Sequence, residues 1–233
     1  MTQQEFDVHA RTYNNVLDQS IEFSGEDSAY FAEYKIKDLH RELTALGVDT
    51  KTDLRILDFG CGVGASIPYL GQYFPSAKLL GVDVSAESLD LARSNHGGLA
   101  SFIKMSGGDL PAEAKSLDAA YAMCVFHHIA ECQHVELLSQ IRSRLKPGGL
   151  LMVYEHNPLN PLTVRVVNNC PFDVNAKLIG GALMEQRCRR AGFGEVSVKY
   201  RVFFPGFLRK FRFVEGLLMW LPLGGQYYVR CVA

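Results

Sequence analysis

The sequence predicts a doubly wound α/β fold with seven strands in a mostly parallel sheet. Three observations support this prediction. Short apolar segments alternate with segments of helical spacing from residue 54 onward. One apolar segment runs into a loop that has glycine at every second position. The first three apolar segments are each followed by an aspartate, as expected where strands share a polar edge.

The composition indicates one ordinary domain and excludes some classes of protein. A chain of 233 residues can bury a substantial core, and its formal charge of -1 does not favour nucleic acid as a partner. Six scattered cysteines without a Cys-x-x-Cys pair favour reduced thiols. The N-terminus shows no secretion signal, and no apolar run reaches the roughly 20 residues of a membrane span. We therefore expect a cytoplasmic protein with no transmembrane segment.

The residues 56–64 form the central motif. Ile56 and Leu57 predict a strand that ends in Asp58, and a loop with Gly60, Gly62 and Gly64 follows. Such a loop turns sharply, lets a ligand approach the backbone, and directs the N-terminus of the next helix at the ligand. The spacing is neither Gly-x-Gly-x-x-Gly nor a phosphate loop ending in Gly-Lys-Ser/Thr. An acid in this place suits a ligand that carries an ammonium group.

The next elements follow the alternation of strand and helix. A helix is predicted over 65–73 with Pro68 in its first turn, then a strand over 78–83 that ends in Asp83. Asp83 stands where nucleotide-binding units keep the carboxylate for a ribose diol. Ser85 is expected to cap a helix over 86–94. A strand over 100–105 is followed by Asp109.

Two more strands complete the first part of the chain. A strand is predicted over 117–124, followed by His127 and His128, and a helix over 131–145 ends at the turn Lys146-Pro147-Gly148-Gly149. The next strand is predicted over 150–155. Asp58, Asp83 and Asp109 would then share one sheet edge, where a ligand with an ammonium, a ribose diol and an exocyclic amine accounts for all three.

Residues 54–155 resemble the class I S-adenosylmethionine-dependent methyltransferases. The hydrophobic-hydrophobic-Asp-x-Gly-x-Gly-x-Gly pattern is similar to their motif I, and Leu-Lys-Pro-Gly-Gly is similar to their turn before strand five. The resemblance implies S-adenosylmethionine as cofactor and S-adenosylhomocysteine as product, with Asp109 on the adenine amino group. It implies cofactor contacts from Tyr13, Asp58, Gly60, Cys61, Gly62, Gly64, Asp83, Val84, Asp109, Leu110, Cys124 and His127. It also implies that strands over 195–204 and 226–232 form an antiparallel hairpin.

Two segments outside this core remain open to alternatives. Residues 1–50 precede the first strand, with a helix from Asp27 or Ser28 to Leu46. This segment either packs on the sheet or forms a lid in which Tyr13, Tyr30 or Tyr34 closes the site. Residues 205–222 are predicted as an apolar helical insertion with Phe207, Phe211, Val214, Leu218 and Leu221 on one stripe. Core or dimer packing, a cover for an apolar or lipid-linked acceptor, and docking on an anionic membrane are the alternatives.

The segment over 157–180 is expected to be a polar acceptor loop, because long loops at a ligand edge are usually functional. It contains Asn157, Asn160, Asn168, Asn169 and Asp173, which are equally typical of turns. A helix over 183–191 with Gly192 as its C-cap is predicted to follow. We thus expect residues 1–50 as a helical lid segment and residues 51–233 as the cofactor-binding domain.

Histidines near this edge are the candidates for a general base. His128 and His156 are preferred, with His127 and Glu155 as further catalytic candidates, because a base with a pKa near neutrality helps to activate a hydroxyl or an acidic carbon. Each histidine also has a purely structural interpretation. The set His127, His128, Glu131, Cys132 and His134 matches no zinc spacing, so no metal is expected.

The leading hypothesis is a methyltransferase for a small-molecule acceptor of the sugar, glycan or secondary-metabolite type. Transfer to oxygen is favoured, with carbon or nitrogen open. Strand four does not end in Asn/Asp-Pro-Pro-Tyr/Phe, the motif that related enzymes use on amide or adenine nitrogens. A nicotinamide oxidoreductase and a non-catalytic cofactor-binding module are the alternatives. A homodimer is compatible with the apolar segment at 205–222.

Overall fold

A computed structural model describes residues 18–21, 25–106, 109–113 and 115–233. Its centre is a seven-stranded sheet in the order β3-β2-β1-β4-β5-β7-β6. The strands are β1 (Arg55–Phe59), β2 (Lys78–Asp83), β3 (Ala100–Lys104), β4 (Leu117–Met123), β5 (Leu145–His156), β6 (Glu195–Arg201) and β7 (Gln226–Val232). β7 runs antiparallel to both of its neighbours, β5 and β6, and the other strand pairs are parallel. The predicted fold class is confirmed.

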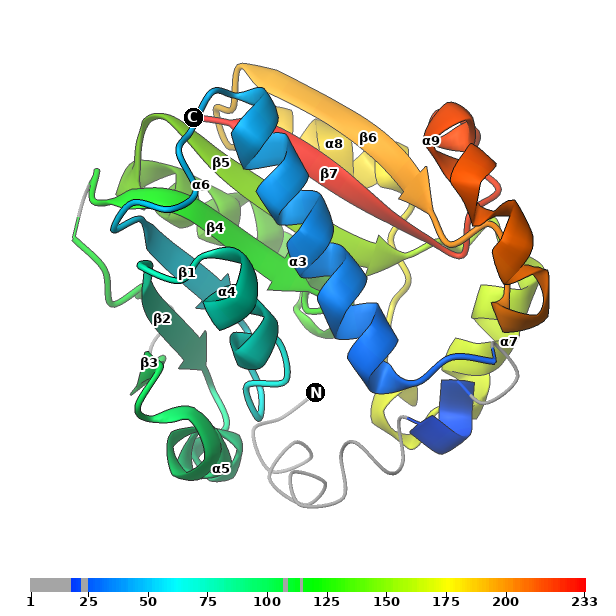
Figure 1. The fold of residues 1–233 in the computed structure, drawn as a ribbon, viewed down its shortest axis with the longest axis horizontal. Coiled ribbons are helices and arrows are strands. Elements are labelled where there is room, and N and C mark those ends of the chain that lie inside the picture. Colours follow the sequence, from blue (N-terminus) through cyan, green and yellow to red (C-terminus); the bar gives the residue numbers. More distant parts are fainter. Residues whose placement is uncertain (1–17, 22–24, 107–108, 114) are drawn as a thin grey trace.

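Helices cover both faces of the sheet (Figure 1). One face carries α3 (Ser28–Ala45), α4 (Ile67–Tyr73) and α5 (Ala86–His96), and the other carries α6 (His134–Arg144) and α8 (Gly181–Arg190). Neighbouring residues of a strand alternate between the faces: in β1, Ile56 packs with the first group and Leu57 with the second. This arrangement brings the carboxyl ends of the parallel strands to one edge.

Local signals set the helix starts that were predicted from sequence. Asp27 caps α3 by accepting the Tyr30 N–H at 2.8 Å, and Ser85 caps α5 by accepting the Ser88 N–H at 3.1 Å. Ile36, Leu39 and Leu43 of α3 are almost fully buried against the sheet. The helix in the expected lid segment therefore forms part of the core on this face.

The structure differs from the prediction in the segment over 157–180. It contains α7 (Pro161–Asn169) and a 3-10 turn, η5 (Pro171–Asp173), instead of a continuous loop. Asn160 caps α7 by accepting the N–H groups of Leu162 and Thr163, and Pro161 occupies the first helical position. A proline needs no N–H there, so the Asn-Pro pair starts a helix rather than a turn.

The segment over 205–222 also differs from the predicted amphipathic helix. Its parts are a 3-10 helix, η6 (Gly206–Val214), with non-helical φ/ψ angles at Leu208, and one turn of α-helix, α9 (Glu215–Leu218). Phe207 and Phe211 of the predicted stripe are 76% and 52% exposed. These two side chains are therefore not packed into the core of the chain, whereas Val214, Leu218 and Leu221 are half-buried.

Two smaller differences concern strand ends. β5 begins at Leu145, opposite Leu117, because the turn with Gly148 at φ +78° forms an irregular start of the ladder before regular pairing resumes at Leu150. β6 ends at Arg201 instead of residue 204. No helix among the described residues is both long and apolar enough to cross a membrane.

Candidate functional site at the carboxyl edge of the sheet

The loop after β1 lies between the two halves of the site. The first half holds the predicted cofactor residues, and the second holds the polar side chains after β4 and β5. Gly60, Gly62 and Gly64 have φ values of +76°, +51° and +79°, which side chains rarely adopt. The Gly60 and Cys61 N–H groups both donate to the Val82 carbonyl, so the loop is tied to β2. Of the atoms in the described chain, none lies within 4 Å of a Cβ built at Gly62. The loop thus offers an open surface of backbone.

Asp58 lies beneath this loop and is only 4% exposed. Its carboxylate accepts the Ser66 hydroxyl at 2.6 Å, and the Tyr121 hydroxyl lies 3.0 Å from the same Ser66 oxygen. Burial raises the pKa of Asp58 to about 6, although the Ser66 and Tyr121 hydroxyls oppose this effect. A bound cation would favour the charged carboxylate.

Asp83 fixes the geometry between the loop and α5. One carboxylate oxygen accepts the Gly62 N–H at 2.8 Å and the other accepts the Ser85 N–H at 2.9 Å. Val84 beside it is 44% exposed and presents apolar surface at the same edge. A carboxylate next to an exposed apolar side chain can receive a diol and a flat ring.

The other predicted cofactor residues take different positions. Asp109 is exposed, whereas Leu110 is buried in the core and its N–H donates to Gln140 at 3.2 Å. Cys61 is buried, and burial raises the pKa of its thiol far above the ordinary value. Tyr13 lies outside the described residues.

A second group of polar side chains gathers beyond the ends of β4, β5 and β7. We name this group the polar cluster: Tyr34, Lys35, Cys124, His156 and Gln226. The Lys35 Nζ atom lies 3.5 Å from the Cys124 sulfur, the Tyr34 hydroxyl donates to the Gln226 side-chain carbonyl, and Gln226 Nε2 lies 3.4 Å from His156 Nδ1. Four elements supply these residues, so the cluster exists only in the folded chain.

Cys124 holds an unusual place in the polar cluster, at φ +57° directly after β4. Its N–H donates to the Tyr154 carbonyl at 2.8 Å, which holds the turn against β5. Burial opposes ionisation of the thiol, but His156 and Lys35 lower its pKa to about 7. No local pattern in the sequence pointed to Lys35, because it belongs to the helix before the first strand.

His127 and Glu155 form a buried pair beside the polar cluster. The His127 Nδ1 atom lies 2.5 Å from one Glu155 oxygen, and the Phe126 N–H donates to the other at 2.8 Å. A carboxylate can only accept, so Nδ1 carries the proton. Although burial favours the neutral ring, Glu155 raises the pKa of His127 to about 10. Burial would raise the pKa of Glu155, but His127 holds it below its ordinary value.

Asp173 reaches this pair from η5. One of its oxygens lies 3.3 Å from His127 Nε2 and 3.4 Å from His128 Nε2. Burial and the neighbouring His127 lower the pKa of His128 to about 3. The centres of the His127 and His156 rings lie 5.4 Å apart. The four catalytic candidates, His127, His128, Glu155 and His156, are therefore close together at one edge of the sheet.

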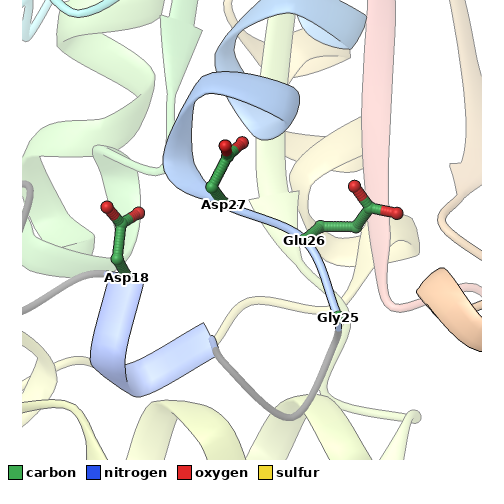
Figure 2. A pocket seen from close by; sticks show the side chains of 4 residues that line it. All are labelled: Asp18, Gly25, Glu26 and Asp27. Carbon is green, nitrogen blue, oxygen red and sulfur yellow. The ribbon is translucent and has the colours of Figure 1, made fainter.

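Glu131 and His134 do not join this group. The Arg187 guanidinium lies 2.9 Å from the Glu131 carboxylate and 2.7 Å from His134 Nδ1, and Cys132 is exposed. Figure 2 shows a separate hollow at the start of α3, lined by Asp18, Gly25, Glu26 and Asp27. Asp18 accepts the Ser28 N–H, Glu26 accepts from Arg212, and Asp27 accepts the Tyr30 N–H. These carboxylates hold the local structure together, so we assign the hollow no ligand.

Comparisons with known proteins agree with this geometry. Residues 56–149 match the family described as a methyltransferase domain. A solved structure of an S-adenosylmethionine-dependent methyltransferase from Thermotoga maritima, described as a possible histamine N-methyltransferase, is similar over 99% of both chains, with a TM-score of 0.69 and 17% identity. The chain thus has the class I methyltransferase fold, and S-adenosylmethionine is the cofactor of this class.

Curated relatives share the same part of the chain. A trans-aconitate 2-methyltransferase from Deinococcus radiodurans is 32% identical over 113 residues, which are 48% of this chain and 42% of the relative. A sterol 24-C-methyltransferase from Gibberella zeae is 28% identical over 157 residues, or 62% of this chain and 40% of the relative. The chain spans less than half the length of these relatives.

Proposed function

We propose that this chain transfers a methyl group from S-adenosylmethionine to a small-molecule acceptor. Transfer to a hydroxyl oxygen is favoured, and a carbon or nitrogen nucleophile stays open. The observation that carries the proposal is the position of the polar cluster next to the glycine loop. The Cβ of an alanine at Gly60 would lie 2.5 Å from Val125, so the loop after β1 and the segment after β4 are in contact.

The residues of the first half fit the cofactor. S-adenosylmethionine, when bound, supplies an electrophilic methyl group on a positively charged sulfur. We assign the buried Asp58 carboxylate to the ammonium group, Asp83 to the ribose hydroxyls, and the open surface at Gly62 to the chain between them. Val84 would contact the adenine ring, and Asp109 its amino group.

Within the second half, His156 is the proposed proton acceptor. In the described ion pairs His127 and His128 each face a carboxylate, whereas His156 faces Cys124 and Gln226. When the acceptor hydroxyl receives the methyl group that the bound cofactor would supply, His156 would accept the proton that the hydroxyl gives up. His127 and Glu155 are proposed to position the segment after β4.

Two segments are proposed to enclose the acceptor. α3 contributes Tyr34 and Lys35 to the polar cluster, and residues 157–180 contribute Asp173 beside the histidines. The Lys177 N–H donates to the His127 carbonyl at 2.9 Å, which ties this second segment to the site. These contacts support the assignment of a lid to residues 1–50 and of an acceptor wall to residues 157–180.

The proposal also covers the cellular compartment of the protein and its partners. All six cysteines are present as thiols in the structure, which supports a reducing, cytoplasmic compartment. The small negative charge favours a metabolite over nucleic acid as the acceptor. The exposed apolar side chains of η6 and α9 support an apolar or lipid-linked acceptor, or a homodimer.

The first experiment is calorimetric titration of the purified chain with S-adenosylhomocysteine and, separately, with NADH. We expect saturable 1:1 binding of S-adenosylhomocysteine and no heat with NADH, because Asp58 opposes a pyrophosphate. Binding of NADH alone would support an oxidoreductase. Binding of S-adenosylhomocysteine without methylated product from any small-molecule fraction would support a non-catalytic module.

The second experiment separates proton transfer from binding. His156→Gln keeps the size and polarity of the side chain but removes the base, so turnover should fall about 100-fold while S-adenosylhomocysteine affinity stays within about twofold. His40→Gln is the control, because His40 contacts Thr50, Tyr73 and Phe74, outside the polar cluster and the glycine loop. Full turnover in His156→Gln would leave positioning alone as the role of this edge.

A further inference from the structure

Three side chains beside the polar cluster direct donor atoms at one point. His127 and His128 come from the segment after β4, and Asp173 comes from η5. One nitrogen of each ring and one carboxylate oxygen lie within 4.8 Å of one another. The side chains are only 1%, 11% and 11% exposed, so His127 is buried and the other two are largely shielded, unlike a surface cluster of charges.

The distances from Asp173 to the two histidine nitrogens are those between neighbouring ligands around one ion. Bonds from zinc to histidine nitrogen and carboxylate oxygen are about 2.0–2.2 Å, and tetrahedral angles then place neighbouring donors about 3.4 Å apart. The Asp173 oxygen lies 3.3 Å from His127 Nε2 and 3.4 Å from His128 Nε2. Three donors on one face would leave the fourth position for water or an acceptor oxygen.

The surroundings of His127 match the outer shell of a metal site. Glu155 accepts the Nδ1–H hydrogen bond at 2.5 Å, so Nε2 is the ring nitrogen that faces Asp173 and is available to a metal once it is deprotonated. This Nε2 atom is buried and makes no hydrogen bond of acceptable geometry in the described chain. A carboxylate that orients the far nitrogen of a metal-ligating histidine is a recurrent arrangement, because it fixes the tautomer and strengthens the ligand.

The charges around the group also favour a cation. Glu155 is a buried carboxylate and Asp173 a largely shielded one, and the described ion pairs join neither of them to a lysine or an arginine. The elements packed around the group present the His156 ring from β5 and the Lys35 ammonium from α3, which faces Cys124. Either a proton on an imidazole or a metal ion can balance the two negative charges.

We propose that His127, His128 and Asp173 bind one divalent transition-metal ion, with zinc the best match, and that Glu155 orients His127 from behind. Two imidazoles and one carboxylate suit Zn²⁺, Co²⁺, Mn²⁺ and Fe²⁺ and are poor ligands for Ca²⁺ or Mg²⁺. Asp173 is far from the two histidines in the sequence, which is why their spacing alone predicted no metal.

The test is metal binding by the untagged full chain. After treatment with a chelator and its removal, the protein is titrated with Co²⁺ alone, and visible absorption is recorded. We expect intense bands of tetrahedral Co²⁺ that saturate at one equivalent and are displaced by Zn²⁺. Mass spectrometry of the zinc-loaded, dialysed protein should then find one zinc per chain.

Variants assign the site. Asp173→Asn and His128→Asn should each weaken Zn²⁺ binding at least tenfold, and their circular dichroism should show whether they are folded. Asp118→Asn is the control, because Asp118 is likewise a largely shielded carboxylate but pairs with Lys146 at 2.6 Å, in a part of the fold remote from the histidines. It should bind zinc as the unaltered chain does.

The unaltered chain decides the inference even if a variant fails to fold. Co²⁺ bands identical to those of the ion in buffer, or less than one tenth of an equivalent of zinc, would overturn the proposal and leave a proton on His127. Equal loss of zinc in Asp118→Asn would also overturn it. Titration with S-adenosylhomocysteine in parallel keeps this outcome separate from the proposed methyl transfer.

Discussion

Gly60 is the residue at which the two halves of the candidate site meet. Its φ of +76° favours glycine, and a Cβ would lie 2.5 Å from Val125 Cγ2. Gly62 has a φ of +51° but faces open space, with no described atom within 4 Å of a Cβ. Substitution at Gly62 would therefore test backbone strain alone, whereas substitution at Gly60 would add a steric clash with Val125.

Gly60→Ala and Gly62→Ala are expected to differ in stability. Gly62→Ala should lower the free energy of unfolding by about 1 kcal/mol, the cost of the left-handed backbone alone. Gly60→Ala should cost about 2–4 kcal/mol because Val125 must also move. Urea unfolding of both variants measures the difference. Equal losses would show that the segment after β4 does not rest on the loop.

Asp58 provides a prediction about pH. Its pKa of about 6 in the folded chain is above the ordinary value, so the folded state holds this proton more tightly than the unfolded state. The stability that this proton contributes is present at pH 4 and is lost as pH rises through 6. In Asp58→Asn the free energy of unfolding should lose this pH dependence between 4 and 6.

The same carboxyl should release its proton when the cofactor binds, because an ammonium group favours the charged form. At pH 6 calorimetry of S-adenosylhomocysteine binding in two buffers of different ionisation enthalpy should show this release, and affinity should fall below pH 6. Asp58→Asn should abolish the buffer dependence. Equal heats in both buffers for the unaltered chain would contradict the placement of the ammonium group.

At the scale of elements, α3 is attached to the sheet by buried charges. Arg201 of β6 lies 2.7 Å from Asp38 of α3 and 3.3 Å from Glu215 of α9. Both carboxylates are nearly fully buried. One guanidinium therefore connects the helix before the first strand to the segment between β6 and β7.

Arg201→Met is expected to destabilise the chain strongly. Removal of the guanidinium leaves two buried carboxylates without their shared partner, which should cost about 3–5 kcal/mol. Lys78→Met is the control, because its pair with Asp53 is exposed and should contribute less than about 1 kcal/mol. Chemical unfolding of both variants measures the difference, and a loss below 1 kcal/mol for Arg201→Met would contradict the network.

Sequence reasoning predicted those elements whose signals are local. The periodicity of β1, the caps Asp27 and Ser85, and the glycine loop depend on neighbouring residues, and the structure has them at the expected positions. The approach of Asp173 to His127, and of Lys35 to Cys124, depends on contacts between distant segments that no local pattern encodes. These contacts could be found only in the folded chain.

The sequence prediction was wrong for two elements, and in each case the residues explain why. Asn160-Pro161 starts a helix as readily as a turn, and its polar neighbours favoured the loop interpretation. Over 205–222, helical spacing of apolar residues predicted burial, but the chain forms a kinked 3-10 helix that leaves several of them exposed. Periodicity indicates a shared face and does not say what covers that face.

At the scale of the molecule, η6, α9 and the following turn present an apolar surface. Its most exposed side chains are Phe207 at 76%, Phe213 at 82%, Leu217 at 77% and Trp220 at 73%. Exposed apolar patches of this kind mark interaction sites more often than isolated exposed residues do. In the single chain these side chains contribute little to the core.

Phe213→Ser combined with Leu217→Ser should therefore leave the free energy of unfolding within about 0.5 kcal/mol of the original value. Leu39→Ala is the buried control and should cost about 2–5 kcal/mol. Urea unfolding at two protein concentrations checks both. A loss above 1 kcal/mol that grows with concentration would show that a second copy covers this surface.

The position of β7 has a consequence for folding during synthesis. This strand is made after all the others, yet it lies between β5 and β6, and Tyr227, Tyr228, Val229 and Cys231 are fully buried there. Until the ribosome has released these residues, β6 has no neighbour and the adjoining edge of β5 is unpaired. An incomplete sheet of this kind can pair with another nascent chain, so slow translation of β7 should increase aggregation.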